Sequence, residues 1–255
     1  MILAIDVGNS NIVLGCIEDD RILFEARMAS DQLKTSDQYA VELSNMLTMF
    51  RVDPLALEGT IVSSVVPPIT NSVKTAVRKL TGKSCKVVGP GLKTGLNIRI
   101  DNPAQAGSDL VVAAVAAIHD YGAPLIVIDL GTATTITVVD KDKSFVGGSI
   151  SPGMKISMNA LTSRTAQLPG VSMEAPPRAI GKNTVDCMQS GIMFGTAAML
   201  DGMVERMEQE LGYKTTVVAT GGLARYVAPL CRHEMQIDKD LLLKGLNLIY
   251  KLNAG

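Results

Sequence analysis

Apolar residues occur in short blocks along the chain, and one arrangement of blocks occurs twice. Residues 3–12 read LAIDVGNSNI and residues 126–135 read IVIDLGTATT. Each copy has the pattern of a buried strand, an Asp-apolar-Gly turn and the start of a second strand. Polar turns at 18–21 and 140–143 follow, and alternation predicts third strands over 22–27 and 144–150. We therefore predict an internal duplication.

The segments after each repeat alternate between helical and strand patterns. Between residues 36 and 50, for example, apolar side chains recur at the three- and four-residue spacing of an amphipathic helix. This order predicts a duplicated α/β fold with a boundary near residue 121, giving domains 1–121 and 122–255. The predicted helices cover 36–50, 69–80, 107–121, 185–211 and 239–252, and the further predicted strands cover 59–66, 85–88 and 216–219.

Length and composition agree with two packed domains and narrow the classes of partner. The chain has 255 residues, roughly 1.7 domains at about 150 residues each. Hydrophobic residues make up 47% and charged residues 19%, which is typical of a packed core and too apolar for a disordered chain. The formal charge is 24 − 25 = −1, so no basic surplus favours a nucleic-acid partner.

Targeting and metal-binding patterns are absent from the sequence. No apolar run approaches the ~20 residues needed to span a bilayer, and Met1–Ile5 reads as a strand rather than a basic leader. Four scattered cysteines without a CxxC spacing, together with two histidines, argue against a zinc site or a disulfide framework. We expect a cytoplasmic protein with no membrane partner.

The two Asp-apolar-Gly turns have the chemistry of a phosphate and metal site. A carboxylate at the end of a buried strand, such as Asp6 or Asp129, is costly unless it is paired or binds a cation. Gly8 and Gly131 allow a phosphate to approach the main chain. Facing each other across a cleft, two such turns could hold a polyphosphate and its metal, although either carboxylate could instead cap its own turn. The donors that follow are Asn9, Ser10, Asn11, Thr132, Thr134 and Thr135.

A third segment has the same character. Residues 217–223 read VVATGGL, a strand that runs into Thr220, Gly221 and Gly222, where a nucleoside or phosphate can approach the backbone. Strand-Gly-Gly-helix junctions are also common for packing reasons. The segment therefore counts only as the third member of a set.

The set resembles the phosphate and adenosine motifs of the acetate and sugar kinase, Hsp70 and actin superfamily. Over essentially its full length the chain is similar to the type III pantothenate kinases. An Hsp70- or actin-like machine is disfavoured because the chain is too short for their subdomain insertions. The segments that carry the resemblance are residues 6–11, 89–95, 101–103, 107–109, 129–134, 147–153 and 181–184.

The resemblance implies two duplicated ribonuclease H-like domains with a nucleotide cleft between them. It also implies phosphoryl transfer from ATP to the terminal hydroxyl of pantothenate, which gives 4'-phosphopantothenate in the first step of coenzyme A biosynthesis. Magnesium would bind near Asp6, and a monovalent cation, potassium or ammonium, near Asp129. The implied nucleotide-binding residues are Asp6, Gly8, Asn9, Ser10, Asn11, Gly131, Thr132, Gly221 and Gly222.

The resemblance also assigns the acceptor site. Asp109 matches the family's general base, although the sequence pattern alone would favour an ordinary first-turn acid of a helix. Thr184 matches a pantothenate contact that family members supply from the neighbouring subunit, which implies a homodimer. The implied acceptor-binding residues are Ile100, Gly107, Ser108, Asp109, Leu110 and Thr184.

Two positions depart from the family pattern. Leu110 stands where members commonly carry Arg, and Ile100 stands where they commonly carry Tyr. An Arg-to-Leu change loses five donors and a positive charge, so Arg99 or Arg164 would have to replace it, or the acceptor is a different small hydroxyl compound. A catalytically silent nucleotide-binding regulator is the other alternative. The presence of Asp109 favours an enzyme.

Overall fold

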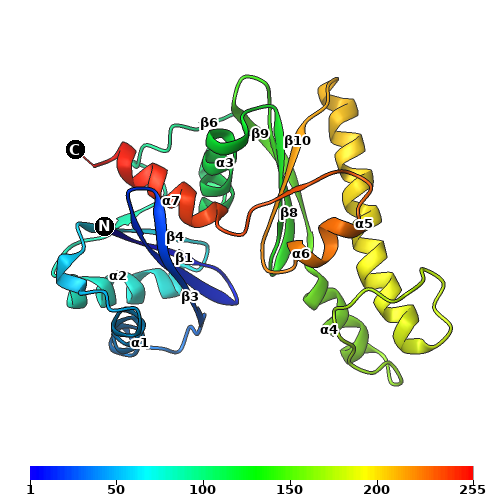
Figure 1. Ribbon diagram of the computed structural model, residues 1–255, viewed down its shortest axis with the longest axis horizontal. Coiled ribbons are helices and arrows are strands. Elements are labelled where there is room, and N and C mark those ends of the chain that lie inside the picture. Colours follow the sequence, from blue (N-terminus) through cyan, green and yellow to red (C-terminus); the bar gives the residue numbers. More distant parts are fainter. Residues whose placement is uncertain (255) are drawn as a thin grey trace. The chain divides into compact units, whose positions relative to one another are not determined.

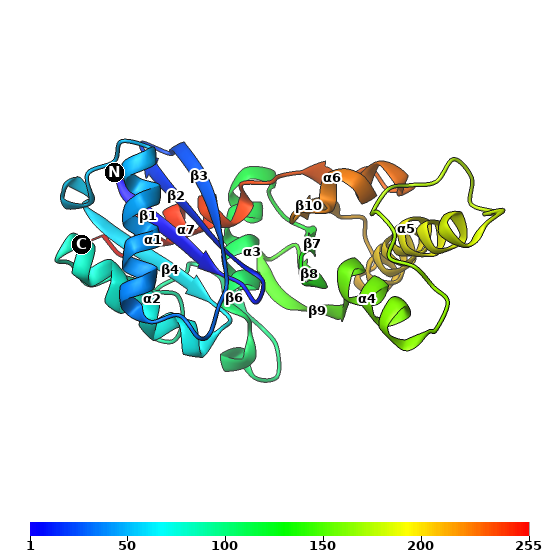
Figure 2. The same cartoon turned by 90° about the horizontal axis from the view of Figure 1, so that it is seen from below.

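The computed structural model describes residues 1–254, and it contains two β-sheets with helices packed against them (Figures 1 and 2). Residue contacts divide the chain into two compact units, and the C-terminal helix belongs with the N-terminal sheet. The proposed domain boundary at residue 121 stays a prediction. Unit 1 comprises Met1–Leu96, Asp101–Ala116 and Asp240–Gly255, and unit 2 comprises Asn97–Ile100 and Ala117–Lys239.

The sheet of unit 1 has the strand order β3-β2-β1-β4-β5. Strand β1 pairs antiparallel with β2 and parallel with β4, so it lies at the centre. The first three strands form the predicted meander, in which two polar residues connect β2 and β3. The strands are β1 (Ile2–Val7), β2 (Asn11–Glu18), β3 (Arg21–Ala29), β4 (Gly59–Ser64) and β5 (Lys86–Val87).

Local sequence sets the helix ends in unit 1. Thr35 caps α1 with a capping box that includes Gln38. Helix α2 begins at Pro67, two residues before the predicted start, because prolines fit the first turn of a helix. It ends at Gly82, whose φ of 68° is left-handed. The helices are α1 (Ser36–Met49), α2 (Pro67–Thr81), α7 (Leu241–Leu252) and α3 (Ser108–Tyr121), which continues into unit 2.

Strand alternation divides the core of unit 1 into two layers. Leu3 and Ile5 belong to the cluster that includes residues of α1 and α2, such as Leu43. Ile2 and Ala4 belong to the opposite cluster, which includes residues of α3 and α7. Successive side chains of a strand point to opposite faces, so the side chain at position 6 shares the α3 and α7 face.

The sheet of unit 2 repeats this arrangement with an added edge strand. Its order is β11-β10-β7-β8-β9-β6, with β7 antiparallel to β8 and parallel to β10. The two-residue edge strands β6 and β11 were not predicted, because so short a run has no periodicity. The strands are β6 (Asn97–Ile98), β7 (Leu125–Leu130), β8 (Ala133–Val139), β9 (Ser144–Pro152), β10 (Thr216–Thr220) and β11 (Gln236–Ile237).

Helices α4, α5 and α6 contribute to the apolar cluster of unit 2. Helix α4 was not predicted, because its sequence has little amphipathic periodicity. Asn183 caps α5, and Gly212 ends it with a φ of 78°. None of the helices in the described part of the chain could cross a membrane. The bounds are α4 (Met154–Arg164), α5 (Thr184–Leu211) and α6 (Ala224–Val227), with short 3₁₀ helices at Pro54–Ala56, Pro103–Gln105 and Ala228–Leu230.

The predicted duplication is confirmed strand by strand. Strands β1, β2, β3 and β4 correspond to β7, β8, β9 and β10 in order and direction. Asp6 lies beside Ser63 of β4, and Asp129 lies beside Thr220 of β10. The fold is therefore α/β with two duplicated ribonuclease H-like domains.

Candidate functional site

In unit 1, the candidate site lies at the carboxyl ends of β1 and β4. Asp6 is 7% exposed and is the penultimate residue of β1. Its neighbour across the parallel ladder, Ser63, is fully buried. Both side chains face α3, because Ile61, two residues before Ser63, belongs to the α3 and α7 cluster. The carboxylate of Asp6 is thus held at a fixed place at the edge of the sheet.

The glycine-containing turn after β1 is held through its backbone. The amide of Gly8 donates to the carbonyl of Asn11 at 3.0 Å. Ser30, directly after β3, donates its hydroxyl to the Gly8 carbonyl at 2.5 Å and its amide to the Ser10 carbonyl at 3.1 Å. Asn9, Ser10 and Asn11 are exposed. The turn therefore presents polar side chains to solvent from a fixed main chain, which suits the binding of phosphate oxygens.

The first residue of α3 is tied to the same edge of the sheet. The Ser108 hydroxyl lies 3.0 Å from the Ser63 hydroxyl, donates to the Ser64 carbonyl at 3.0 Å and accepts from the Ser64 amide at 3.1 Å. Because Ser63 neighbours Asp6, these bonds bring the start of α3 to the end of β1. Two segments about one hundred residues apart in sequence thus meet within unit 1.

Asp109 follows in the first turn of α3. Its Oδ1 accepts from the Leu110 amide at 2.9 Å, and burial raises the pKa of the carboxyl above its ordinary value. A Cβ added at Gly107 would lie 2.5 Å from this oxygen, so glycine at 107 makes room for the carboxylate. A half-buried carboxylate that accepts a backbone hydrogen bond and has a raised pKa has the properties of a general base.

The positions that depart from the family pattern lie in different units. Leu110 is half-buried in the first turn of α3 in unit 1, whereas Ile100 belongs to unit 2. Both predicted substitutes for the missing arginine, Arg99 and Arg164, belong to unit 2. Arg99 lies 3.7 Å from the Asp140 carboxylate within unit 2, and Arg164 is exposed at the end of α4.

In unit 2, the second and third motifs lie against each other. Asp129 of β7 pairs in register with Thr220 of β10. Gly221 follows with a φ of 91°, and a Cβ there would collide with the Asp129 carboxylate and lie 2.7 Å from backbone atoms of Leu130. Only glycine fits this contact. The structure therefore joins two of the segments that the sequence analysis could only list together.

The turn after β7 resembles its counterpart after β1. The Gly131 amide donates to the Ala133 carbonyl at 3.1 Å, and Thr132 is exposed. A Cβ on Gly153 would collide with the Thr132 carbonyl, so the chain after β9 packs closely on this turn. Thr134, in contrast, is 1% exposed within β8 and is not available to a ligand in this structure.

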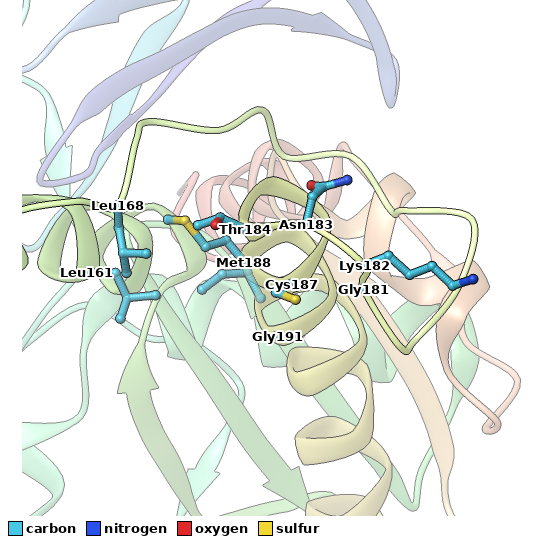
Figure 3. Close-up of a pocket in the computed structure, with 10 residues that line it drawn as sticks. Leu161, Leu168, Gly181, Lys182, Asn183, Thr184, Cys187, Met188 and Gly191 are labelled. Carbon is cyan, nitrogen blue, oxygen red and sulfur yellow. The ribbon is translucent and has the colours of Figure 1, made fainter.

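Thr184 lies at a separate cavity of about 650 Å³ in unit 2 (Figure 3). Asn183, just before it, accepts from the Asp186 amide at 2.9 Å and fixes the start of α5. Leu161 contributes an apolar side chain to the cavity, while the side chain of Lys182 extends away from the cavity. The cavity is lined by Leu161, Leu168, Gly181, Lys182, Asn183, Thr184, Cys187, Met188, Gly191 and Ile192.

Sequence reasoning missed the residues that support the site. Ser30 holds the first turn, and Ser63 and Ser64 hold the start of α3. One signal could have revealed the pair, since adjacent serines at the end of a buried strand are unusual for a core position. The sequence around Ser30 carries no such signal, because a serine directly after a strand is common.

Asp6 could hold a magnesium ion together with substrate phosphates. Within residues 1–254 there is no group of three or more His, Cys, Asp or Glu side chains that could hold a metal. Magnesium is usually bound through one or two carboxylates together with water and substrate phosphates. A single carboxylate such as Asp6, beside a turn suited to phosphate, matches that requirement.

Comparison with known proteins gives a consistent picture. The profile of the family described as "Type III pantothenate kinase" matches residues 2–206. Relatives with that name from Exiguobacterium sp. and Brevibacillus brevis are each 44% identical, covering 99% and 100% of both chains respectively. The structure of a putative 2-dehydro-3-deoxygalactonokinase from Sinorhizobium meliloti shares the fold, with a TM-score of 0.61 at 14% identity over 100% of this chain and 99% of that one.

Proposed function

This chain belongs to the type III pantothenate kinase family, and from that premise we propose the roles of its individual residues. The protein transfers a phosphoryl group from ATP to pantothenate, giving 4'-phosphopantothenate in the first step of coenzyme A biosynthesis. A silent regulator is not favoured. The observation that supports the residue assignments best is a hydrogen bond between Ser108, at the start of the helix that carries Asp109, and Ser63 of β4, which pairs in register with Asp6 of β1.

We propose that Asp109 is the general base. It would accept the proton of the pantothenate hydroxyl as that oxygen bonds to the γ-phosphorus of ATP, while the bond from this phosphorus to the bridging oxygen breaks and ADP leaves. Such transfer depends on positioning and charge stabilisation, so a fixed carboxylate at the start of α3 suits the task. Gly107 supports this role by leaving room for the carboxylate.

The nucleotide phosphates are proposed to bind at the two Asp-apolar-Gly turns. Asp6 would hold magnesium, which neutralises charge on the phosphates when bound. In unit 1 the contacts would come from the first turn, and in unit 2 from Gly131 and Thr132. Gly221 and Gly222 would lie against the adenosine, since a glycine backbone permits the close approach of a nucleoside. The first-turn residues are Gly8, Asn9, Ser10 and Asn11.

Asp129 is proposed to bind a monovalent cation, potassium or ammonium. Its carboxylate is half-buried at the end of β7 and lies directly against Gly221. A carboxylate enclosed in this way is stabilised by a nearby cation. The position next to both nucleotide motifs of unit 2 would let the cation assist phosphate binding.

Acceptor binding is proposed to require a homodimer. Thr184 would contact pantothenate bound to a second copy of the chain, together with Ile100 and Leu110 of that copy. Apolar side chains around the start of α5 support an interface there, since Ile180 is 83% exposed. Leu110 and Ile100 make the pocket more apolar than the family pattern. We also propose a cytoplasmic location, where ATP is available.

The test is ATP consumption by the purified protein with magnesium and potassium, with and without pantothenate. We expect pantothenate-dependent ADP release and a product with the mass of 4'-phosphopantothenate. Omitting potassium, or replacing it with sodium, tests the Asp129 proposal, and sedimentation tests the dimer. ATP binding without pantothenate-dependent turnover would contradict the proposed assignments and point to another acceptor.

A further inference from the structure

The Ser108 hydroxyl has no hydrogen-bonding capacity left for a ligand. A serine hydroxyl has one proton to donate and two lone pairs to accept. Its proton goes to the Ser64 carbonyl, and one lone pair accepts from the Ser64 amide. The remaining contact, to Ser63 at 3.0 Å, must then use the Ser63 proton and the second lone pair. All three positions are thus occupied by groups of β4.

We propose that Ser108 is a positioning residue, whose hydroxyl fixes the start of α3 on the end of β4 and so holds the Asp109 carboxylate where the acceptor hydroxyl must lie. The inference rests on the proposed role of Asp109 as the base. It differs from a role of Ser108 in binding substrate directly. Ser108 acts through the next residue in the chain, and it touches neither ATP nor pantothenate.

The local geometry explains why one hydroxyl can have this effect. Ser108, the residue before Asp109, is held on β4 by the hydrogen bond from its hydroxyl to the Ser64 carbonyl. On the other side, the Leu110 amide donates to the Asp109 carboxylate at 2.9 Å. Gly107 also packs closely on the carboxylate, because an added Cβ there would lie 2.5 Å from Oδ1 of Asp109. A misplacement of about 1 Å costs on the order of 100-fold in rate.

The bonds also control the surroundings of the carboxylate. Burial raises the pKa of Asp109, and that burial depends on α3 staying against the sheet. If the bonds to β4 are lost, water reaches the carboxylate and its pKa falls toward the ordinary value. A purely structural role of Ser108 would change stability without changing this pKa.

The test compares three variants by kcat, by KM for ATP and by NMR titration of the Asp109 carboxyl carbon. Ser108→Ala removes all three bonds, and Ser108→Thr keeps the hydroxyl. Ser64→Ala is the matched control, because it removes the side-chain bonds to Thr70 and Val66 but keeps the Ser64 backbone groups that bond Ser108.

We expect Ser108→Ala to lower kcat by roughly 10- to 100-fold with KM for ATP unchanged, and to lower the pKa of Asp109. Ser108→Thr and Ser64→Ala should keep both values near those of the unmodified protein. If Ser108→Ala does not fold, Ser63→Ala, which removes one bond of the three, should give smaller changes in the same direction.

Two results would overturn the inference: a folded Ser108→Ala protein with unchanged kcat and Asp109 pKa, or a Ser64→Ala protein changed to the same extent. Failure of the proposed function is distinguishable, because it would show as absent turnover in the unmodified protein. The NMR titration would still decide whether Ser108 positions Asp109.

Discussion

Gly221 approaches Asp129 so closely that no side chain fits between them. A Cβ at position 221 would collide with the Asp129 carboxylate, and the φ of 91° is one that glycine adopts without strain. The contact joins the end of β10 to the end of β7 across their parallel ladder. Two motifs about ninety residues apart in sequence therefore form one structural feature of unit 2.

Replacing this glycine should disrupt the site in addition to straining the backbone. Gly221→Ala is expected to weaken ATP binding by roughly 10-fold or more, because the added methyl group must push Asp129 and the Leu130 backbone away. Gly212→Ala is the matched control, since its φ of 78° is also left-handed but nothing lies within 4 Å of the added carbon.

The control should lose only about 1–2 kcal/mol of unfolding free energy, the ordinary cost of a left-handed residue with a side chain. Isothermal calorimetry and urea unfolding measure the two effects. Equal ATP affinities of the two variants would show that the contact between Gly221 and Asp129 has no role in nucleotide binding.

Asp109→Asn should abolish turnover and increase stability. Asparagine can still accept from the Leu110 amide, but it cannot take a proton from the acceptor. Because burial raises the pKa of Asp109, the folded state binds a proton more readily than the unfolded state. Its stability therefore falls as the pH rises from the ordinary Asp value through the raised one, and the loss persists at neutral pH.

We expect Asp109→Asn to remove that loss, so that its unfolding free energy at pH 7 exceeds that of the unmodified protein, with ATP affinity retained. Urea unfolding at pH 7 and at a pH below the ordinary Asp value measures this, and the difference should shrink at the lower pH. An active Asn variant would exclude Asp109 as the base.

The pH dependence of kcat should report the same carboxyl group. A general base must be deprotonated, so the rate should fall as the pH drops through the raised pKa of Asp109. The acidic limb is thus expected above the ordinary value of about 3.9 for Asp. The position of this acidic limb is measured by stopped-time product assays across pH, with protein stability checked at each pH value. An acidic limb at or below the ordinary value would indicate a solvated carboxylate.

Thr60 offers a stability test away from the site. Its hydroxyl is the one buried side-chain oxygen or nitrogen without a hydrogen-bond partner in the described part of the chain. Thr60→Val replaces that hydroxyl with a methyl group of similar shape and should raise the unfolding free energy by about 1 kcal/mol. The reverse change in the same strand, Val62→Thr, buries a new hydroxyl and should lower it. Lower stability of Thr60→Val would reveal a partner of this hydroxyl.

The sequence predicted the fold well where the elements are long. The repeated Asp-apolar-Gly unit led to the correct α/β duplication, and helices α1, α3 and α5 lie within a residue of the predicted ranges. Prediction failed for α4, which has little amphipathic pattern, and for the two-residue strands β6 and β11. Such elements depend on tertiary contacts more than on local preference.

By itself the sequence determined the repeat, the motifs and the family, because these depend on residue type and order along the chain. Only the tertiary structure showed which motifs lie together within each unit. The bonds from Ser63 and Ser64 to Ser108, and the contact of Gly221 with Asp129, join residues distant in sequence. Strand register decides such neighbours, and register follows from the packing of whole sheets, which no local pattern records.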